Sequence, residues 1–101
     1  MVTIKFELNK ENIIKAKHTE KGLIDFLHKF YVIERKATEI EHLVYQRDDA
    51  NAMCDLGDII TIMQYNSQFM DYFTSCIWDV DGEVEDIIAG VKDYNRKYPP
   101  K

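Results

Sequence analysis

Apolar and polar residues alternate strictly over residues 2–8, at the start of the chain. A period of two residues is typical of a β-strand that has one buried face. The apolar positions of this segment are Val2, Ile4, Phe6 and Leu8. Asn9 follows the segment and offers a helix N-cap, which predicts a short helix over residues 10–17.

The longest helical pattern of the chain covers residues 19–46. Its apolar residues fall at alternating spacings of three and four, which places them on one face of a helix. They are Leu23, Phe26, Phe30, Ile33, Ala37, Ile40 and Val44. With Thr19 as the N-cap, the pattern predicts one long helix over residues 19–46 that buries Phe26, Phe30, Ile33 and Ile40.

Helix and strand patterns overlap between residues 56 and 80. Leu56, Ile59 and Met63 are spaced as in a helix, whereas residues 72–80 alternate. A strand over residues 2–8 needs a partner for its backbone N–H and C=O groups, and residues 73–79 match it best. The sequence therefore predicts a helix over about 49–64, a short helix or turn near 67–72 and a strand near 73–79.

The last part of the chain has the signals of a helix. Asp81 and Gly82 indicate a turn, and Asp81 is expected to cap the helix that follows. Pro99 and Pro100 end this helix, because proline cannot continue it. Its buried face is expected to consist of Val84, Ile87, Ile88, Val91 and Tyr94.

Together these elements predict a helix-dominated α+β fold with a short N-terminal strand, a long central helix, a second strand near 73–79 and a C-terminal helix. The alternative is an all-α bundle with an irregular N-terminal arm. A chain of 101 residues corresponds to a single small globular domain over residues 1–101.

The composition is that of a globular protein, since 46% of the residues are hydrophobic. Cys54 and Cys76 lie in apolar surroundings and are interpreted as buried free thiols. Residues 1–8 lack the apolar core of a signal peptide, and residues 59–78 carry polar side chains that a membrane span excludes. These features favour a cytoplasmic location. The frequent use of residues with AT-rich codons favours a bacterial or mobile-element origin.

Charge is distributed unevenly along the chain. The net charge is −5, but residues 48–91 contain ten Asp and Glu residues and no Lys or Arg. Such a segment predicts a negative surface that attracts a basic protein, or else a set of solvated caps and turns. It argues against direct nucleic-acid binding, which requires clustered Lys and Arg.

The sequence gives little indication of catalysis. Asp79, Asp81 and Gly82 resemble part of an EF-hand calcium loop, but positions 1 and 12 of that loop would be Ile77 and Ile88. The spacing of His28, Arg35 and His42 favours a solvated helix face over a ribonuclease site. We therefore expect no enzyme, and no catalytic, cofactor-binding or metal-binding residues.

These observations predict a small acidic, helix-rich protein with a non-catalytic, protein-binding or regulatory role. The sharper form of this hypothesis is inhibition of a basic partner, such as a nuclease or a DNA-binding protein. One alternative is a structural homo-oligomer, such as a homodimer formed through the aromatic residues of 59–78, and another is an enzyme of unknown chemistry. The proposed partner-binding residues are Asp48, Asp49, Asp55, Asp58, Asp79, Glu83, Glu85 and Asp86.

Overall fold

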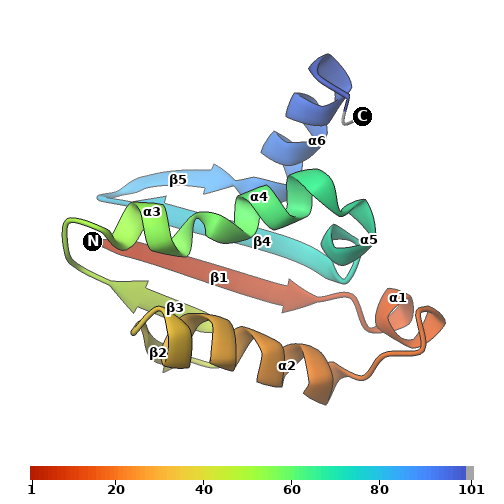
Figure 1. Ribbon diagram of the computed structural model, residues 1–101, viewed down its shortest axis with the longest axis horizontal. Helices are drawn as coiled ribbons and strands as arrows, with labels where there is room; N and C mark the ends of the chain where they lie inside the picture. Colours follow the sequence, from red (N-terminus) through yellow and green to blue (C-terminus); the bar gives the residue numbers. More distant parts are fainter. Residues whose placement is uncertain (100–101) are drawn as a thin grey trace.

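The computed structural model describes residues 1–99, in which five antiparallel strands form one sheet of order β2-β3-β1-β4-β5. The main helices lie over one face of this sheet (Figure 1). The strands are β1 (Val2–Leu8), β2 (Thr38–Glu41), β3 (Val44–Arg47), β4 (Phe73–Val80) and β5 (Glu83–Asp86). The helices are α1 (Lys10–Lys15), α2 (Glu20–His28), the π-helix η1 (Lys29–Glu34), α3 (Ala52–Leu56), α4 (Asp58–Tyr65), α5 (Ser67–Met70) and α6 (Ile87–Lys97).

The helix-dominated fold predicted from the sequence is therefore wrong, as is the all-α bundle. The chain adopts a mixed α/β fold with 49% helix and 27% strand. The physical reason lies in β1, which is the middle strand of the sheet and needs a hydrogen-bonded neighbour on both sides. The predicted fold gives β1 one neighbour, the strand near 73–79, and leaves the backbone groups on its other side without a partner.

The prediction of β1 and of its partner β4 is confirmed. The two strands pair antiparallel, with Ile4 opposite Trp78. Val2, Ile4 and Phe6 are buried under the helices, whereas Lys5 lies exposed on the other face of the sheet. The alternation along β1 thus separates a covered face from an open one.

The predicted helix over residues 19–46 is wrong in its second half. Thr19 caps α2 as expected, and the helical backbone continues through η1 to Glu34. The chain then turns at Lys36, whose φ is +57°, and residues 38–47 form the hairpin of β2 and β3. β3 pairs with β1 and completes the sheet, and this pairing overrides the helical spacing.

Burial follows the observed elements and departs from the predicted helix face. Phe30 is buried, but Phe26, Ile33 and Ile40 are 41%, 54% and 46% exposed. Ile33 lies at the end of η1 and Ile40 on the edge strand β2, where the core does not reach.

The region after Arg47 follows the prediction closely. The expected helix over 49–64 is present as α3 and α4, joined at Gly57, and the short helix near 67–72 is α5. Leu56, Ile59 and Met63 are fully buried beneath these helices.

The C-terminal helix begins later than predicted. Asp81 and Gly82 both have positive φ, at +53° and +93°, which is the backbone of a tight hairpin turn. They join β4 to β5, so that the N-cap of α6 is Asp86 instead of Asp81. Val84 therefore lies on the edge strand β5 and is exposed, and Tyr94 on α6 is also exposed, contrary to the predicted buried face.

The two cysteines are both free thiols, as the sequence predicted, but they differ in exposure. Cys76 on β4 is buried in the core, whereas Cys54 on α3 is exposed. The interpretation of Cys54 as buried is therefore wrong, because it faces away from the sheet on a short helix. Within residues 1–99, no helix has the length and apolarity required to cross a membrane.

Candidate functional site

Acidic residues from two parts of the 48–91 segment, one after β3 and one around the β4–β5 turn, meet at one end of the sheet. Val2, the first residue of β1, pairs with Arg47 of β3 on one side and with Val80 of β4 on the other. The loop after β3 and the β4–β5 turn therefore flank the start of β1, close to the N-terminus in Figure 1. We call this region the acidic end and define it by Asp48, Asp49, Asp55, Asp79, Asp81 and Glu83.

The amino group of Met1 connects the two clusters directly. Its nitrogen lies 3.3 Å from the Asp48 carboxylate and also donates to the Asp81 carboxylate. The backbone N–H of Asp81 donates to the carbonyl of Met1 at 3.0 Å. Asp48 and Asp81 are 33 residues apart in sequence but share one cation in space.

Arg47 organises the acidic side chains that follow β3. Its guanidinium donates two hydrogen bonds of 2.7 Å to Asp49 and one of 2.6 Å to Asp55. A further bond of 2.9 Å goes to the backbone carbonyl of Arg35. The Arg47 side chain is only 15% exposed, and its hydrogen bonds, with that of the Asn51 N–H, hold the pKa of Asp49 below its ordinary value.

The acidic end nevertheless remains strongly negative. Within residues 1–99 its six carboxylates share two cations, the Met1 ammonium and Arg47, which leaves a formal charge of −4. Asp79 accepts a hydrogen bond of 2.7 Å from the Gly82 N–H, which fixes the hairpin turn. Glu83 is exposed on the edge strand β5.

Three residues of the predicted partner-binding set lie outside the acidic end. Asp58 begins α4 and pairs with Arg35 at 3.2 Å. Glu85 lies opposite Trp78, whose indole N–H donates to it at 3.5 Å, and Asp86 caps α6. Asp81 belongs to the acidic end but was not among the predicted partner-binding residues, because it was expected to cap the last helix. The Asp-Gly pair before residues 83–86 is a hairpin signal that identifies its true position.

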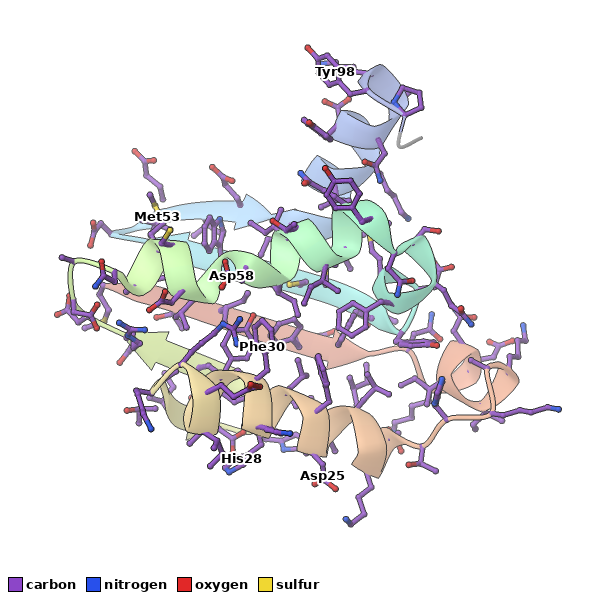
Figure 2. The ribbon with its side chains drawn as sticks, viewed as in Figure 1. Asp25, His28, Phe30, Met53, Asp58 and Tyr98 are labelled. Atoms are coloured by element: carbon purple, nitrogen blue, oxygen red, sulfur yellow. The ribbon has the colours of Figure 1, made fainter. Side chains whose placement is uncertain are left out.

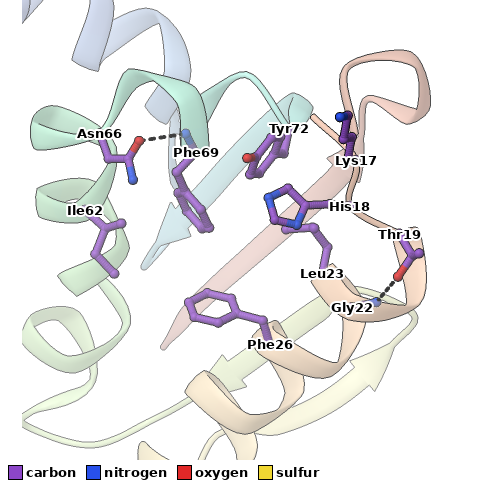
Figure 3. Close-up of a pocket in the computed structure, with 10 residues that line it drawn as sticks. All are labelled: Lys17, His18, Thr19, Gly22, Leu23, Phe26, Ile62, Asn66, Phe69 and Tyr72. Atoms are coloured by element: carbon purple, nitrogen blue, oxygen red, sulfur yellow. Dashed lines mark hydrogen bonds between the residues drawn. The ribbon is translucent and has the colours of Figure 1, made fainter. Parts of the chain in front are cut away.

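A second feature is an apolar groove between α2 and the α4–α5 segment (Figure 3). It has a volume of about 640 Å³, and Leu23, Phe26, Ile62 and Phe69 form its apolar walls. Phe26 and Phe69 reach toward each other from the two sides, with ring centroids 5.6 Å apart. His18, Asn66 and Tyr72 lie at its polar edge. The groove was not predicted from the sequence, because Phe26 was expected on the buried face of the long helix.

Arg35, which follows η1, connects the α2–η1 segment to the α3–α4 segment. Its guanidinium lies 3.5 Å from the centre of the Phe30 ring and donates to Asp58 on α4 and to the carbonyl of Asp55. Figure 2 shows Phe30 between the helices, with Asp58 across from it, while Asp25 and His28 point away. This contact holds the end of η1 against the start of α4, whereas the groove lies nearer the start of α2.

Comparison with known protein families, curated proteins and solved structures finds no match. Within residues 1–99, no group of three or more His, Cys, Asp or Glu side chains is placed to hold a metal ion. His28, Arg35 and His42 do not share a helix face, because the helical backbone ends at Glu34. The acidic end and the apolar groove are the two features that suit binding.

The aromatic stretch over residues 59–78 contributes mainly to the core. Met63, Met70, Tyr72 and Phe73 are buried, whereas Tyr65 is exposed at the end of α4. Ile62 and Phe69 of this stretch line the groove, and the homodimer through these aromatic residues stays a prediction.

Proposed function

We propose that this protein binds a basic protein through its acidic end and acts without catalysis, as a regulator or inhibitor. The observation that carries the proposal is the convergence of Asp48 and Asp49 with Asp79, Asp81 and Glu83 at one end of the sheet. A formal charge of −4 on a small area produces a field that steers a positively charged partner and speeds its encounter.

The distribution of cations supports a docking role for this end. Some exposed acids elsewhere on the described chain pair locally with lysines on the same helix, as Glu11 does with Lys15 and Asp25 with Lys21. Glu83, by contrast, projects from the edge strand β5, where a partner has access. Its position suits a protein that presents Lys and Arg side chains along a surface.

The test is affinity purification from the native host with three versions of the chain as parallel baits. The first is the wild type, and the second carries Asp48→Lys and Glu83→Lys, which removes the formal charge of the acidic end. Neither substitution touches the Arg47 network, so the fold is expected to survive. We expect the wild type to retain a basic protein that this variant does not retain.

The third bait is a matched control with the same change in net charge. Glu7→Lys and Asp71→Lys lie at the opposite end of the sheet, since Leu8 pairs with Phe73 there. Both side chains are exposed. The control should retain the same basic protein as the wild type. Equal retention of every basic protein by all three baits would contradict the proposal.

A further inference from the structure

The apolar groove has the size and composition of a small-molecule site. Its volume of about 640 Å³ lies within the range of roughly 300–1,000 Å³ that is typical of ligand pockets. Leu23 and Phe26 come from α2, and Ile62 and Phe69 come from α4 and α5. Phe26 keeps 41% of its surface exposed although it faces other aromatic rings, so an apolar ligand placed against it would remove that surface from water.

The polar edge of the groove presents hydrogen-bond donors. The side-chain oxygen of Asn66 accepts from the Phe69 N–H at 3.1 Å, and that of Thr19 accepts from the Gly22 N–H at 3.0 Å. Both oxygens serve as helix caps, as the dashed lines in Figure 3 show. The amide NH₂ of Asn66 remains available as a donor at the rim, and in Figure 3 the ring of Phe69 lies between it and the side chains of His18 and Tyr72.

The charge of the groove is opposite to that of the whole chain. The net charge of the protein is −5, yet among the described residues no Asp or Glu side chain lines the groove. The ionisable groups at its edge are Lys17, His18 and Tyr72. Donors without acidic neighbours favour a ligand that carries a negative, hydrogen-bond-accepting group. The lining contains no arginine, which favours a single carboxylate over a phosphate.

The size of the groove favours a short ligand over an extended peptide, because its volume of about 640 Å³ is that of a small-molecule pocket. On its polar side His18 packs edge-on against Tyr72, with ring centroids 5.4 Å apart.

We propose that the groove binds a medium-chain fatty acid, with its hydrocarbon chain against Leu23, Phe26, Ile62 and Phe69. Its carboxylate lies at the polar edge and accepts a hydrogen bond from the ring of His18. This site is separate from the acidic end and does not depend on the proposed protein partner. The groove lies between α2 and the α4–α5 segment, away from the acidic end at the start of β1.

The experiment is a titration of the ¹⁵N-labelled protein with decanoate, followed by two-dimensional NMR, with decanol and decylamine as probes of the head group. Decanoate should bind saturably and shift the amides of Gly22, Leu23 and Phe69. Decanol should bind about tenfold more weakly, because it lacks the charged acceptor. Decylamine should not bind. No saturable decanoate binding, or equal binding of decylamine, would overturn the proposal.

Three variants locate the site. Phe26→Glu places a carboxylate in the apolar wall and should abolish decanoate binding. Ile33→Glu is the matched control, since Ile33 is exposed on η1 outside the groove, and it should bind as the wild type does. His18→Ala should weaken decanoate binding by roughly tenfold and leave decanol binding unchanged. Decanoate binding that survives Phe26→Glu in a folded variant, or is lost in Ile33→Glu, would place the ligand elsewhere and overturn the assignment.

Discussion

Tyr31 and Tyr45 stack on each other in the core, with ring centroids 4.8 Å apart, but their hydroxyl groups differ. The Tyr31 hydroxyl donates to the carbonyl of Leu56 at 3.3 Å. The Tyr45 hydroxyl is buried and makes no hydrogen bond of acceptable geometry within the described chain. Burial, with a smaller effect of the Glu39 carboxylate, raises the pKa of Tyr45.

This difference predicts opposite effects of the same substitution. Tyr31→Phe should lower the free energy of unfolding by about 1 kcal/mol, because it leaves the Leu56 carbonyl without its donor. Tyr45→Phe should leave the free energy of unfolding unchanged or raise it by up to about 1 kcal/mol, because it removes an unsatisfied polar group. Urea denaturation measures both. A loss of stability in Tyr45→Phe as large as that in Tyr31→Phe would contradict the assignment.

The two thiols should differ as clearly in reactivity. Cys54 is exposed, whereas burial raises the pKa of the Cys76 thiol, with a smaller effect of Asp86, and so keeps it protonated at neutral pH. We expect a disulfide reagent at pH 8 to modify Cys54 rapidly in the native protein. Cys76 should react only after denaturant is added. Equal rates for the two thiols in the folded protein would show that the reagent reaches Cys76 on β4, and would contradict its burial.

Among the elements, the α3–α4 junction depends on a glycine for steric reasons. A Cβ at Gly57 would lie 2.7 Å from the backbone oxygen of Met53 and 3.2 Å from the Trp78 ring. Gly57→Ala should therefore lower the free energy of unfolding by about 1–3 kcal/mol. Gly90 in α6 has open space around it, so Gly90→Ala should raise this free energy by about 0.5–1 kcal/mol. Thermal unfolding of both variants checks the contrast, and a neutral Gly57→Ala would contradict it.

The loop after β3 should show a specific dependence on pH. Because the folded pKa of Asp49 is lowered, mainly by Arg47, its stabilising effect is present above the unfolded value of 3.8. The effect is lost as the pH falls through the folded pKa. The difference in Tm between the wild type and Asp49→Asn should therefore be clear at about pH 7 and shrink as the pH falls below 3.8. Glu83→Gln is the control, with a small difference at both pH values. A difference for Asp49→Asn that persists at low pH would be inconsistent with the Arg47 contact.

Comparison of the elements shows which parts of the fold a single sequence determines. β1, β4 and the helices from α3 to α5 were predictable, because their periodicity and their caps agree with their tertiary pairing. The hairpin of β2 and β3 was not, because Ile33, Ala37, Ile40 and Val44 continue a helical spacing by coincidence. Its local signal was the alternation of Thr38, Glu39, Ile40 and Glu41, which is too short to compete with a pattern of 28 residues.

The candidate site was predictable only in part, for the same reason. The sequence indicated a segment rich in acids, but the grouping of those acids depends on which strands pair. Asp81 joins the acidic end and Asp86 leaves it because residues 83–86 form a strand before α6 begins. The apolar groove could not be predicted, since it requires α2 to end near Phe30 and to lie beside α4 without packing tightly against it.

At the scale of the whole molecule, charge and apolar surface are separated. The sheet and its single helical layer form a flat body of 36 × 33 × 20 Å, with the acidic end at the start of β1 and the apolar groove on the helical side. This arrangement lets one end attract a basic protein while the groove accepts a ligand of the opposite charge. The two proposals can therefore fail independently.

The dependence of the association rate on salt tests whether the acidic end recruits the basic partner. The rate constant for binding the basic partner is measured for the wild type, for Asp48→Lys with Glu83→Lys, and for Glu7→Lys with Asp71→Lys. Salt is varied from about 0.05 to about 0.3 M, over which the screening length falls below about 8 Å. We predict a steep decrease for the wild type and the control pair, and a slower, nearly salt-independent rate for the acidic-end pair. The same rate and the same salt dependence in all three proteins would contradict the claim that the acidic end recruits the partner.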